Sequence, residues 1–165
     1  MRRIRFKRPR GRGIKILLLL VSLAVAAFQY FYRTGDVPKS NDPRCSGVAA
    51  CFAGPVTRVV DGDTLDVSGE RIRLVLVDAP ERATSFGPAA TEFLREHCPL
   101  GSAALVDQDD LQQTDRYGRM LAVVWCGETR VNDAIIRAGH ARLYKRFCRQ
   151  SEFGVQLWAV TLGCE

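Results

Sequence analysis

Apolar and polar residues alternate along three segments in the middle of the chain. The segments are Val56–Val60, Thr64–Val67 and Arg71–Val77. The first is rich in β-branched residues, and the other two alternate in the way that a half-buried strand requires. The turn sequences DGD and SGE separate the three segments, and Pro80 follows the last. This pattern predicts three consecutive strands joined by tight turns.

The second half of the chain predicts two further strands and three helices. The strands are Ala103–Asp107 and Met120–Cys126, and the helices are Pro88–Cys98, Val131–Ala138 and Ser151–Leu162. Apolar residues recur three or four positions apart in the helical segments, and Gly139 is a typical stop signal for the second. Five short strands with interspersed helices predict an α+β fold, a small closed barrel with about three helices packed on it.

The N-terminal part differs from the rest in charge and hydropathy. Residues 1–15 hold eight Lys or Arg and no acid, residues 16–32 hold no charged side chain, and residues 33–44 are polar with two prolines. An uncharged helix of this length spans roughly 28 Å, close to the thickness of a bilayer core. We expect a basic cytoplasmic region, a transmembrane signal anchor and a linker. The small residues of Ala24-Val25-Ala26 leave a cleaved signal peptide open as the alternative.

Either alternative places the domain at residues 45–165 outside the cytoplasm. The domain is membrane-anchored in the periplasm or at the cell surface, or it is secreted if the signal is cleaved. The chain of 165 residues carries a net charge of +6, which on its own favours a nucleic-acid partner. From Ser46 onward, however, 13 basic side chains face 16 acidic ones. The positive charge therefore belongs to the N-terminal signal, and the ordinary composition excludes collagen-like, coiled-coil and wholly disordered chains.

Six cysteines point to disulfides. They are Cys45, Cys51, Cys98, Cys126, Cys148 and Cys164. An even number of cysteines without a Cys-x-x-Cys motif, in an exported domain, favours three disulfides over a zinc site. Several pairings are open; we favour sequential pairing, which closes the first loop, ties a helix end to a hairpin and holds the C-terminal segment.

Three polar clusters carry the candidate chemistry. They are Asp61-Gly62-Asp63-Thr64, Arg73 with Asp78-Ala79-Pro80-Glu81, and Asp115-Arg116-Tyr117-Gly118-Arg119. Each lies at a strand end or in a turn, where functional sites tend to be built. Taken singly, each is explained by turn chemistry or by a surface ion pair, so none of them alone indicates a function.

Together, these clusters resemble the staphylococcal nuclease family. The matching segments, in the family's order, are VVDGDT (Val59–Thr64), IRLVLVDAPE (Ile72–Glu81), TDRYGRMLA (Thr114–Ala122) and VNDAIIRAGHA (Val131–Ala141). The resemblance covers roughly Val56 to Tyr144. It implies an OB-fold barrel and a Ca²⁺-dependent phosphodiesterase that acts on DNA and RNA with little sequence preference. The alternative that we keep open is a catalytically inactive OB-fold module that binds nucleic acid or protein.

The resemblance also implies roles for individual residues. Asp63, Asp78 and the backbone carbonyl of Ala79 are expected to bind Ca²⁺, which prefers oxygen ligands. Arg73 and Arg119 are expected to hold the scissile phosphate, and Glu81 to activate or position the attacking water. Asp61 is expected to support the metal loop, and Tyr117 and Tyr144 to contact the substrate. The family often has Thr at the position of Ala79 and a longer loop where this chain has only residues 82–86.

Two further expectations concern residues outside these motifs. His97 and His140 are expected to be structural. Asp107, Asp109 and Asp110 are expected to form a solvated strand end.

The nucleic-acid substrate and the membrane are the expected partners, and we expect a monomer because no obligate protein partner is indicated.

Overall fold

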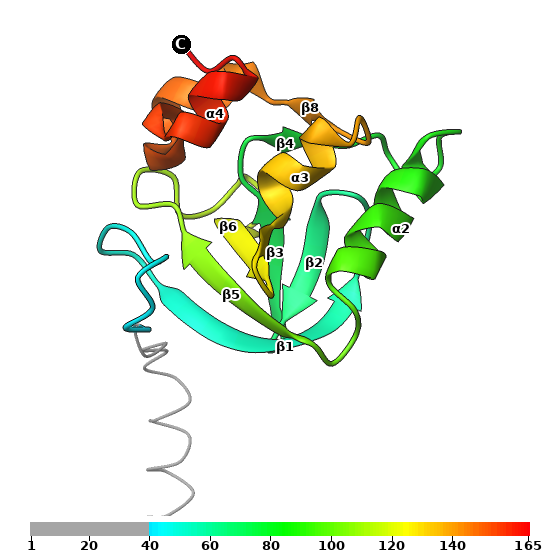
Figure 1. The fold of residues 1–165 in the computed structure, drawn as a ribbon, viewed down its shortest axis with the longest axis horizontal. Coiled ribbons are helices and arrows are strands. Elements are labelled where there is room, and N and C mark those ends of the chain that lie inside the picture. The colour runs from blue at the N-terminus through cyan, green and yellow to red at the C-terminus, as the bar shows by residue number, and fades with distance from the viewer. Residues whose placement is uncertain (1–39) are drawn as a thin grey trace, which may run out of the picture. The chain divides into compact units, whose positions relative to one another are not determined.

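Five strands close into a barrel, as the sequence predicts (Figure 1). The structure is a computed structural model that describes residues 40–165. The barrel strands are β1 (Cys51–Val59), β2 (Thr64–Val67), β3 (Glu70–Leu74), β5 (Ala103–Gln108) and β6 (Met120–Cys126). They follow the order β3-β2-β1-β5-β6, and a parallel pairing of β3 with β6 closes the sheet. This arrangement confirms the OB-fold. The short strand β7 (Thr129–Arg130) pairs antiparallel with the end of β6.

The predicted alternation fills the barrel with apolar side chains. The fully buried residues include Leu65, Val67, Ile72, Leu74, Val106 and Val124. Helix α2 (Gly87–His97) adds Ala90 and Leu94 to this core, and helix α3 (Val131–Arg137) adds Val131 and Ile135. Burial of these side chains holds both helices against the barrel.

Strand β1 begins at Cys51 rather than at Val56 because it serves two neighbours. Its first part, up to Pro55, pairs with β5, and its second part pairs with β2. Gly54 lies where the partner changes, and a Cβ atom there would overlap the side chain of Ser68. The glycine and proline that interrupt the strand pattern in the sequence therefore mark the bend of β1 between two partners.

The predicted strand Arg71–Val77 is wrong in its second half. Strand β3 ends at Leu74, Leu76 has a positive φ of 61°, and the chain then forms a separate strand, β4 (Val77–Asp78). β4 pairs with β8 (Arg142–Leu143) in a small second sheet. The alternation fails here because Val75 and Leu76 pack in a second apolar cluster, whereas Val77 packs in the barrel core.

The predicted last helix, Ser151–Leu162, is also divided. After the 3-10 helix η1 (Lys145–Gln150) come a second 3-10 helix, η2 (Glu152–Val155), and α4 (Leu157–Leu162). Gln156 between them is extended, and Gly154 lies so close to Cys148 that a Cβ atom would overlap its carbonyl oxygen. Phe153 and Trp158 bury their rings in the second apolar cluster, which packs this segment against the outside of the barrel.

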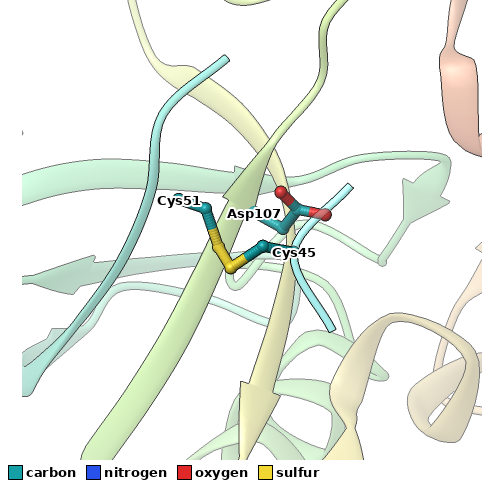
Figure 2. A group of neighbouring side chains, drawn as sticks. All are labelled: Cys45, Cys51 and Asp107. Carbon is teal, nitrogen blue, oxygen red and sulfur yellow. A yellow bond between two sulfur atoms is a disulfide. The ribbon is translucent and has the colours of Figure 1, made fainter. Parts of the chain in front are cut away.

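Three disulfides form with the predicted sequential pairing. Cys45–Cys51 closes the loop before β1, Cys98–Cys126 ties the end of α2 to β6, and Cys148–Cys164 joins η1 to the C-terminus. Figure 2 shows the Asp107 carboxylate beside the Cys45–Cys51 bridge. Both sulfurs are bonded to each other, so this cluster offers no thiolate ligand to a metal.

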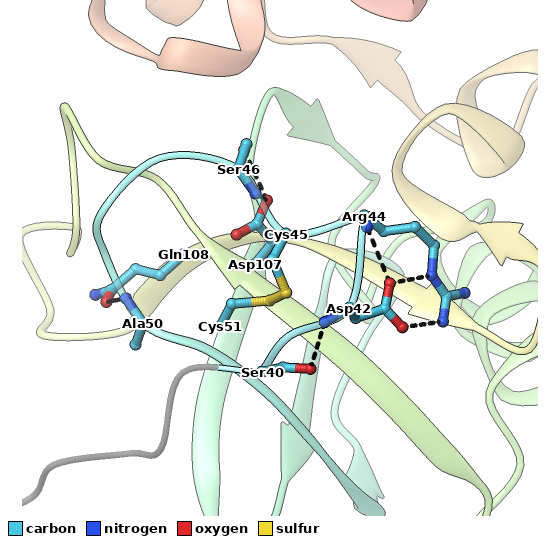
Figure 3. The surroundings of a disulfide bond; sticks show 9 residues. All are labelled: Ser40, Asp42, Arg44, Cys45, Ser46, Ala50, Cys51, Asp107 and Gln108. Carbon is cyan, nitrogen blue, oxygen red and sulfur yellow. Dashed lines mark hydrogen bonds and ion pairs between the residues drawn. A yellow bond between two sulfur atoms is a disulfide. The ribbon is translucent and has the colours of Figure 1, made fainter.

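Asp107 and Asp109 are buried, which corrects the expectation of a solvated strand end. The backbone N–H and the hydroxyl of Ser46 both donate to Oδ2 of Asp107, at 2.9 and 2.8 Å (Figure 3). Asp109 Oδ1 accepts backbone N–H groups at the start of the next loop, including that of Leu111 at 2.9 Å. The loop that the Cys45–Cys51 disulfide closes therefore supplies donors that stabilise a buried acid.

The predicted segments 1–15 and 16–32 lie outside the described residues. Within residues 40–165, the helices are too short or too polar to cross a membrane.

Candidate functional site

A buried ion pair between Asp63 and Arg73 forms the centre of the candidate site. Arg73 Nη1 lies 2.6 Å from Asp63 Oδ1, and Asp63 is only 4% exposed. The register of β2 with β3 places Thr64 opposite Arg73, so the antiparallel hairpin brings the two side chains together. Arg73 is a charged residue in an otherwise apolar strand, and its side chain lies at the edge of the barrel, where it meets Asp63.

The second oxygen of Asp63 connects the pair to Ala79. The backbone N–H of Ala79 donates to Asp63 Oδ2 at 3.1 Å, and the Thr64 hydroxyl donates to Oδ1 at 3.0 Å. The Asp61 carboxylate accepts the backbone N–H of Asp63 at 3.1 Å and so closes the turn that carries Asp63. The residues predicted to bind the metal, Asp63, Asp78 and Ala79, therefore come from two segments that are in direct contact.

Close packing at Gly62 holds these two segments together. A Cβ atom on Gly62 would lie 2.5 Å from Ala90 Cβ and 2.9 Å from Ala79 Cβ. The Asp61–Asp63 turn is thus pressed between α2 and the chain after β4, at a distance that only glycine allows. The small side chain at residue 79 contributes to this fit.

Burial raises the pKa of Asp63 to about 6. The positive charge of Arg73 and the hydrogen bond from Ala79 act in the opposite direction, but they do not offset the loss of solvation. A cation bound here would favour the charged carboxylate. The donors at the site are carboxylate and carbonyl oxygens, which suit a hard divalent cation such as Ca²⁺ or Mg²⁺ better than zinc.

Arg119 approaches the same centre from the loop before β6. Its Nη1 lies 3.5 Å from the Thr64 hydroxyl, which itself bonds Asp63. Asp115 positions the guanidinium: its Oδ2 accepts Arg119 Nε at 2.7 Å, and its Oδ1 accepts the backbone N–H of Tyr117 at 2.8 Å. Two guanidinium groups therefore flank one carboxylate at the open end of the β2–β3 hairpin.

The sequence motifs assign no role to Asp115, which lies in the same cluster as Arg119. The signal is present: an Asp at the start of a turn, with Gly118 at a positive φ of 76° and an arginine four residues after the Asp, is typical of a side chain that caps its own turn. Asp115 thus serves both as the cap of the loop and as the partner of Arg119.

The remaining predicted site residues are more exposed. Asp78 and Glu81 have exposed side chains, and Tyr117 is 69% exposed, with the Arg116 guanidinium 4.7 Å from its ring centroid. Tyr144 packs edge-on against Phe147, at 4.6 Å between centroids. The contacts described for Tyr144 connect it to the second apolar cluster rather than to Asp63 or Arg119.

The short loop after Glu81 is folded tightly. The Glu81 carbonyl accepts both the backbone N–H and the hydroxyl of Thr84 at 2.8 Å. Gly87, the first residue of α2, packs so closely on the Glu81 carbonyl that a Cβ atom would overlap it. The backbone of Glu81 is thus fixed to α2, whereas its carboxylate remains free to meet a ligand from solvent.

Comparison with known proteins gives consistent matches. Residues 71–158 match a family described as staphylococcal nuclease homologue. The chain is 34% identical to a thermonuclease of Staphylococcus intermedius over 138 residues, 77% of this chain and 77% of that protein. It is 38% identical over 105 residues to an uncharacterized endonuclease of Escherichia coli O157:H7 (61% and 66%) and 33% identical over 120 residues to a micrococcal nuclease of Shigella flexneri (62% and 64%).

Proposed function

The chain belongs to the staphylococcal nuclease family, and we propose that it hydrolyses phosphodiester bonds of DNA or RNA with little sequence preference, using Ca²⁺. The observation that supports this best is the position of Asp63, whose two carboxylate oxygens contact Arg73 and the Ala79 N–H. The two arginines and the oxygen donors for a cation therefore occur within one small region. This combination suits the cleavage of a phosphodiester, because a cation and guanidinium groups stabilise the charge on its oxygens.

The arginines have the chemistry to hold the scissile phosphate. Arg73 and Arg119 donate to its non-bridging oxygens, and they remain charged at any relevant pH. Arg73 Nη2 makes only a long bond of 3.4 Å to the Val77 carbonyl, and a phosphate oxygen is a stronger partner for it. In the transition state, both guanidinium groups stabilise the negative charge that develops on these oxygens.

Glu81 acts on the attacking water. Its carboxylate accepts a proton from the water, whose oxygen bonds to phosphorus as the P–O bond to the leaving sugar oxygen breaks. Asp63, Asp78 and the Ala79 carbonyl would hold Ca²⁺, which, when bound, would polarise the phosphate and offset part of its negative charge. Tyr117, exposed beside Arg116 and Arg119, offers its ring to a base of the substrate.

The alternative of a binding module without activity requires the loss of part of this set. This chain retains Asp63, Arg73, Asp78, Glu81 and Arg119. Asp63 also makes its hydrogen bonds with both Arg73 and Thr64. We therefore favour the enzyme over the binding module.

We also propose that the domain works outside the cytoplasm. Three disulfides in a domain of this size are typical of an oxidising compartment. The uncharged segment at residues 16–32 supplies the means of export, as an anchor or as a cleaved signal. A membrane-impermeant thiol label applied to whole cells should react with the domain only after reduction. Labelling without a reductant contradicts the disulfides, and no labelling even after reduction argues against this location.

The test of the activity uses the full chain, oxidised, with single-stranded DNA and either Ca²⁺ or EDTA. We expect cleavage only with Ca²⁺. Arg119→Ala should lower kcat at least about a thousandfold, because arginines in comparable sites contribute that much. Glu81→Gln should lower kcat about a hundred- to ten-thousandfold, the usual contribution of a general base. Arg137→Ala, a change at an exposed arginine on α3, is the control and should match the parent. DNA that stays intact with Ca²⁺ argues against the enzyme, and full activity of both site variants argues against the site.

A further inference from the structure

A pocket of about 420 Å³ adjoins the candidate active site. One wall consists of residues 78–80, from the last residue of β4 onward, and a second wall is formed by Phe86 and Ala89 at the start of α2. Residues 139–142, from just after α3 to the first residue of β8, complete it. Asp78 and Ala79 belong both to this pocket and to the proposed metal site, so a ligand in the pocket lies next to the scissile bond. Its volume is in the range of pockets for ligands of nucleotide size.

The pocket has an exposed aromatic ring at its edge. Phe86 is 74% exposed, although an aromatic side chain of this size is usually buried. Its backbone is fixed, because its carbonyl accepts the N–H of Ala90 in the first turn of α2. The loop before it is closed by the bonds of Thr84 to Glu81. The ring is therefore presented from a rigid base, which favours stacking with a flat apolar ligand.

Residues 139–142 bring a positively charged side chain to the pocket lining. Arg142 is exposed, and the pairing of β4 with β8 places it opposite Asp78. The His140 ring lies 5.1 Å from the Phe93 ring, which in turn stacks on His97 at 4.1 Å. Both histidines therefore pack on Phe93, and His140 belongs to the pocket lining as well.

We propose that this pocket binds an unpaired nucleobase of the substrate strand next to the scissile phosphodiester. Phe86 stacks on the base, and Arg142 contacts the neighbouring phosphate. This inference rests on the proposed nuclease function and adds a second substrate contact to it. A base that is paired in a duplex must leave its partner to reach Phe86, which costs free energy. Duplex substrate therefore gains less from this pocket than single-stranded substrate does.

The binding test uses the full chain with Glu81→Gln, in Ca²⁺, and a fluorescent single-stranded oligothymidylate. Phe86→Ala should raise the Kd about tenfold, in keeping with the contribution of one stacked base. Phe86→Trp should restore tight binding, and Arg142→Ala should weaken it and reduce its salt dependence. Leu100→Ala, at a second exposed apolar side chain, is the control and should bind like the parent.

The kinetic test uses the active chain. Phe86→Ala should raise the KM for single-stranded DNA about tenfold with little change in kcat, and it should lower the ratio of single-strand to duplex cleavage by a similar factor. The unfolding midpoint of Phe86→Ala should remain near that of the parent, because the ring is exposed. A loss of kcat without a change in KM overturns the inference.

A photo-crosslink separates this inference from the nuclease proposal. An oligonucleotide that carries 5-iodouracil should crosslink to Phe86, as identified by mass spectrometry of the peptide. Cleavage of DNA by a chain that crosslinks elsewhere, and in which Phe86→Ala has no effect on binding, overturns the pocket and leaves the nuclease proposal intact. A crosslink at Phe86 in a chain that cleaves nothing supports the pocket and contradicts the nuclease proposal.

Discussion

The side-chain amide of Asn132 donates to the backbone carbonyl of Val75 at 3.0 Å and so ties α3 to the chain directly after β3. The same amide donates to the Ala122 carbonyl at 3.1 Å, and its oxygen accepts the N–H of Val124 at 2.9 Å. Asn132 is completely buried. It therefore fastens the seam between β3 and β6 to the segment that leads to Asp78.

Replacement of Asn132 by Ala should destabilise the protein by about 2–4 kcal/mol, because it leaves buried backbone groups without partners. Activity should also fall, since the segment from Val75 to Ala79 loses its attachment. Urea denaturation followed by circular dichroism measures the first effect. Asn41→Ala, at an exposed position, is the control. An unchanged urea midpoint for Asn132→Ala contradicts the role of this amide.

Asp115 should matter for catalysis through Arg119 alone. Partial burial acts to raise the pKa of Asp115, but the hydrogen bonds from Arg119 and Tyr117 outweigh it, and the pKa is lowered. The carboxylate is therefore charged and holds the Arg119 guanidinium in place. Asp115→Ala should lower kcat about ten- to a hundredfold, a typical cost of a misplaced charged group in an active site.

A double-mutant cycle tests whether the two residues act as a unit. In the Arg119→Ala background, Asp115→Ala should have no further effect on kcat. Additive losses in the double variant mean that Asp115 acts independently of Arg119.

The raised pKa of Asp63 predicts a pH dependence of stability in EDTA. The pKa of Asp63 is about 6 in the folded state, against an ordinary value of 3.8. Between these two pH values the Asp63 carboxyl is therefore protonated in the folded protein and charged in the unfolded protein. The stability that this group contributes is complete below about pH 4 and is lost as the pH rises through 6. The loss amounts to about 3 kcal/mol, from about 1.4 kcal/mol per pKa unit.

The comparison of Asp63→Asn with the parent isolates this effect. Relative to the parent, the variant should gain stability as the pH rises from about 4 to 7, and Glu70→Gln, at an exposed strand position, should show no such trend. Urea denaturation at several pH values measures the difference. A difference that is independent of pH shows that Asp63 titrates normally.

Glu152 should destabilise the metal-free protein at neutral pH. Burial raises its pKa, and the nearby charges of Asp110, Asp109 and Asp107 act in the same direction, against the hydrogen bond from the Asp110 N–H. Its stabilising contribution is thus lost as the pH rises through its folded-state pKa. Glu152→Gln keeps an oxygen acceptor for that N–H and removes the charge.

The unfolding temperature of Glu152→Gln should therefore exceed that of the parent at pH 7, and the gain should disappear at about pH 4, where the glutamate is protonated. Glu96→Gln, on the exposed face of α2, is the matched control. A variant that melts below the parent at pH 7 shows that the carboxylate has a favourable partner that outweighs the repulsion.

The barrel could be predicted because each of its strands buries one face. Apolar and polar residues therefore alternate along the strand with a period of two. The proximity of Asp63, Arg73 and Arg119 could be predicted because they occur in motifs whose order is specific. The separation of β3 from β4 could not, because Val75, Leu76 and Val77 are all apolar and face two different cores. A run of apolar residues does not record which core each side chain enters.

The burial of Asp107 and Asp109 could not be predicted for a different reason. Acidic side chains are normally solvated, and these two are stabilised by N–H groups from distant parts of the chain. The Ser46 donors depend on the loop that Cys45 and Cys51 close. No local pattern in the sequence indicates that a loop more than fifty residues away supplies the partners of an acid.

The pairing of β4 with β8 has a consequence for the order in which the protein becomes active. Asp78 lies opposite Arg142, and the N–H of Tyr144 donates to the Leu76 carbonyl at 2.9 Å. A ribosome completes the barrel strands before it reaches residue 142. A growing chain that ends earlier lacks the strand that holds Asp78 in place, so catalysis becomes possible only after the C-terminal part has been synthesised and has folded back onto β4.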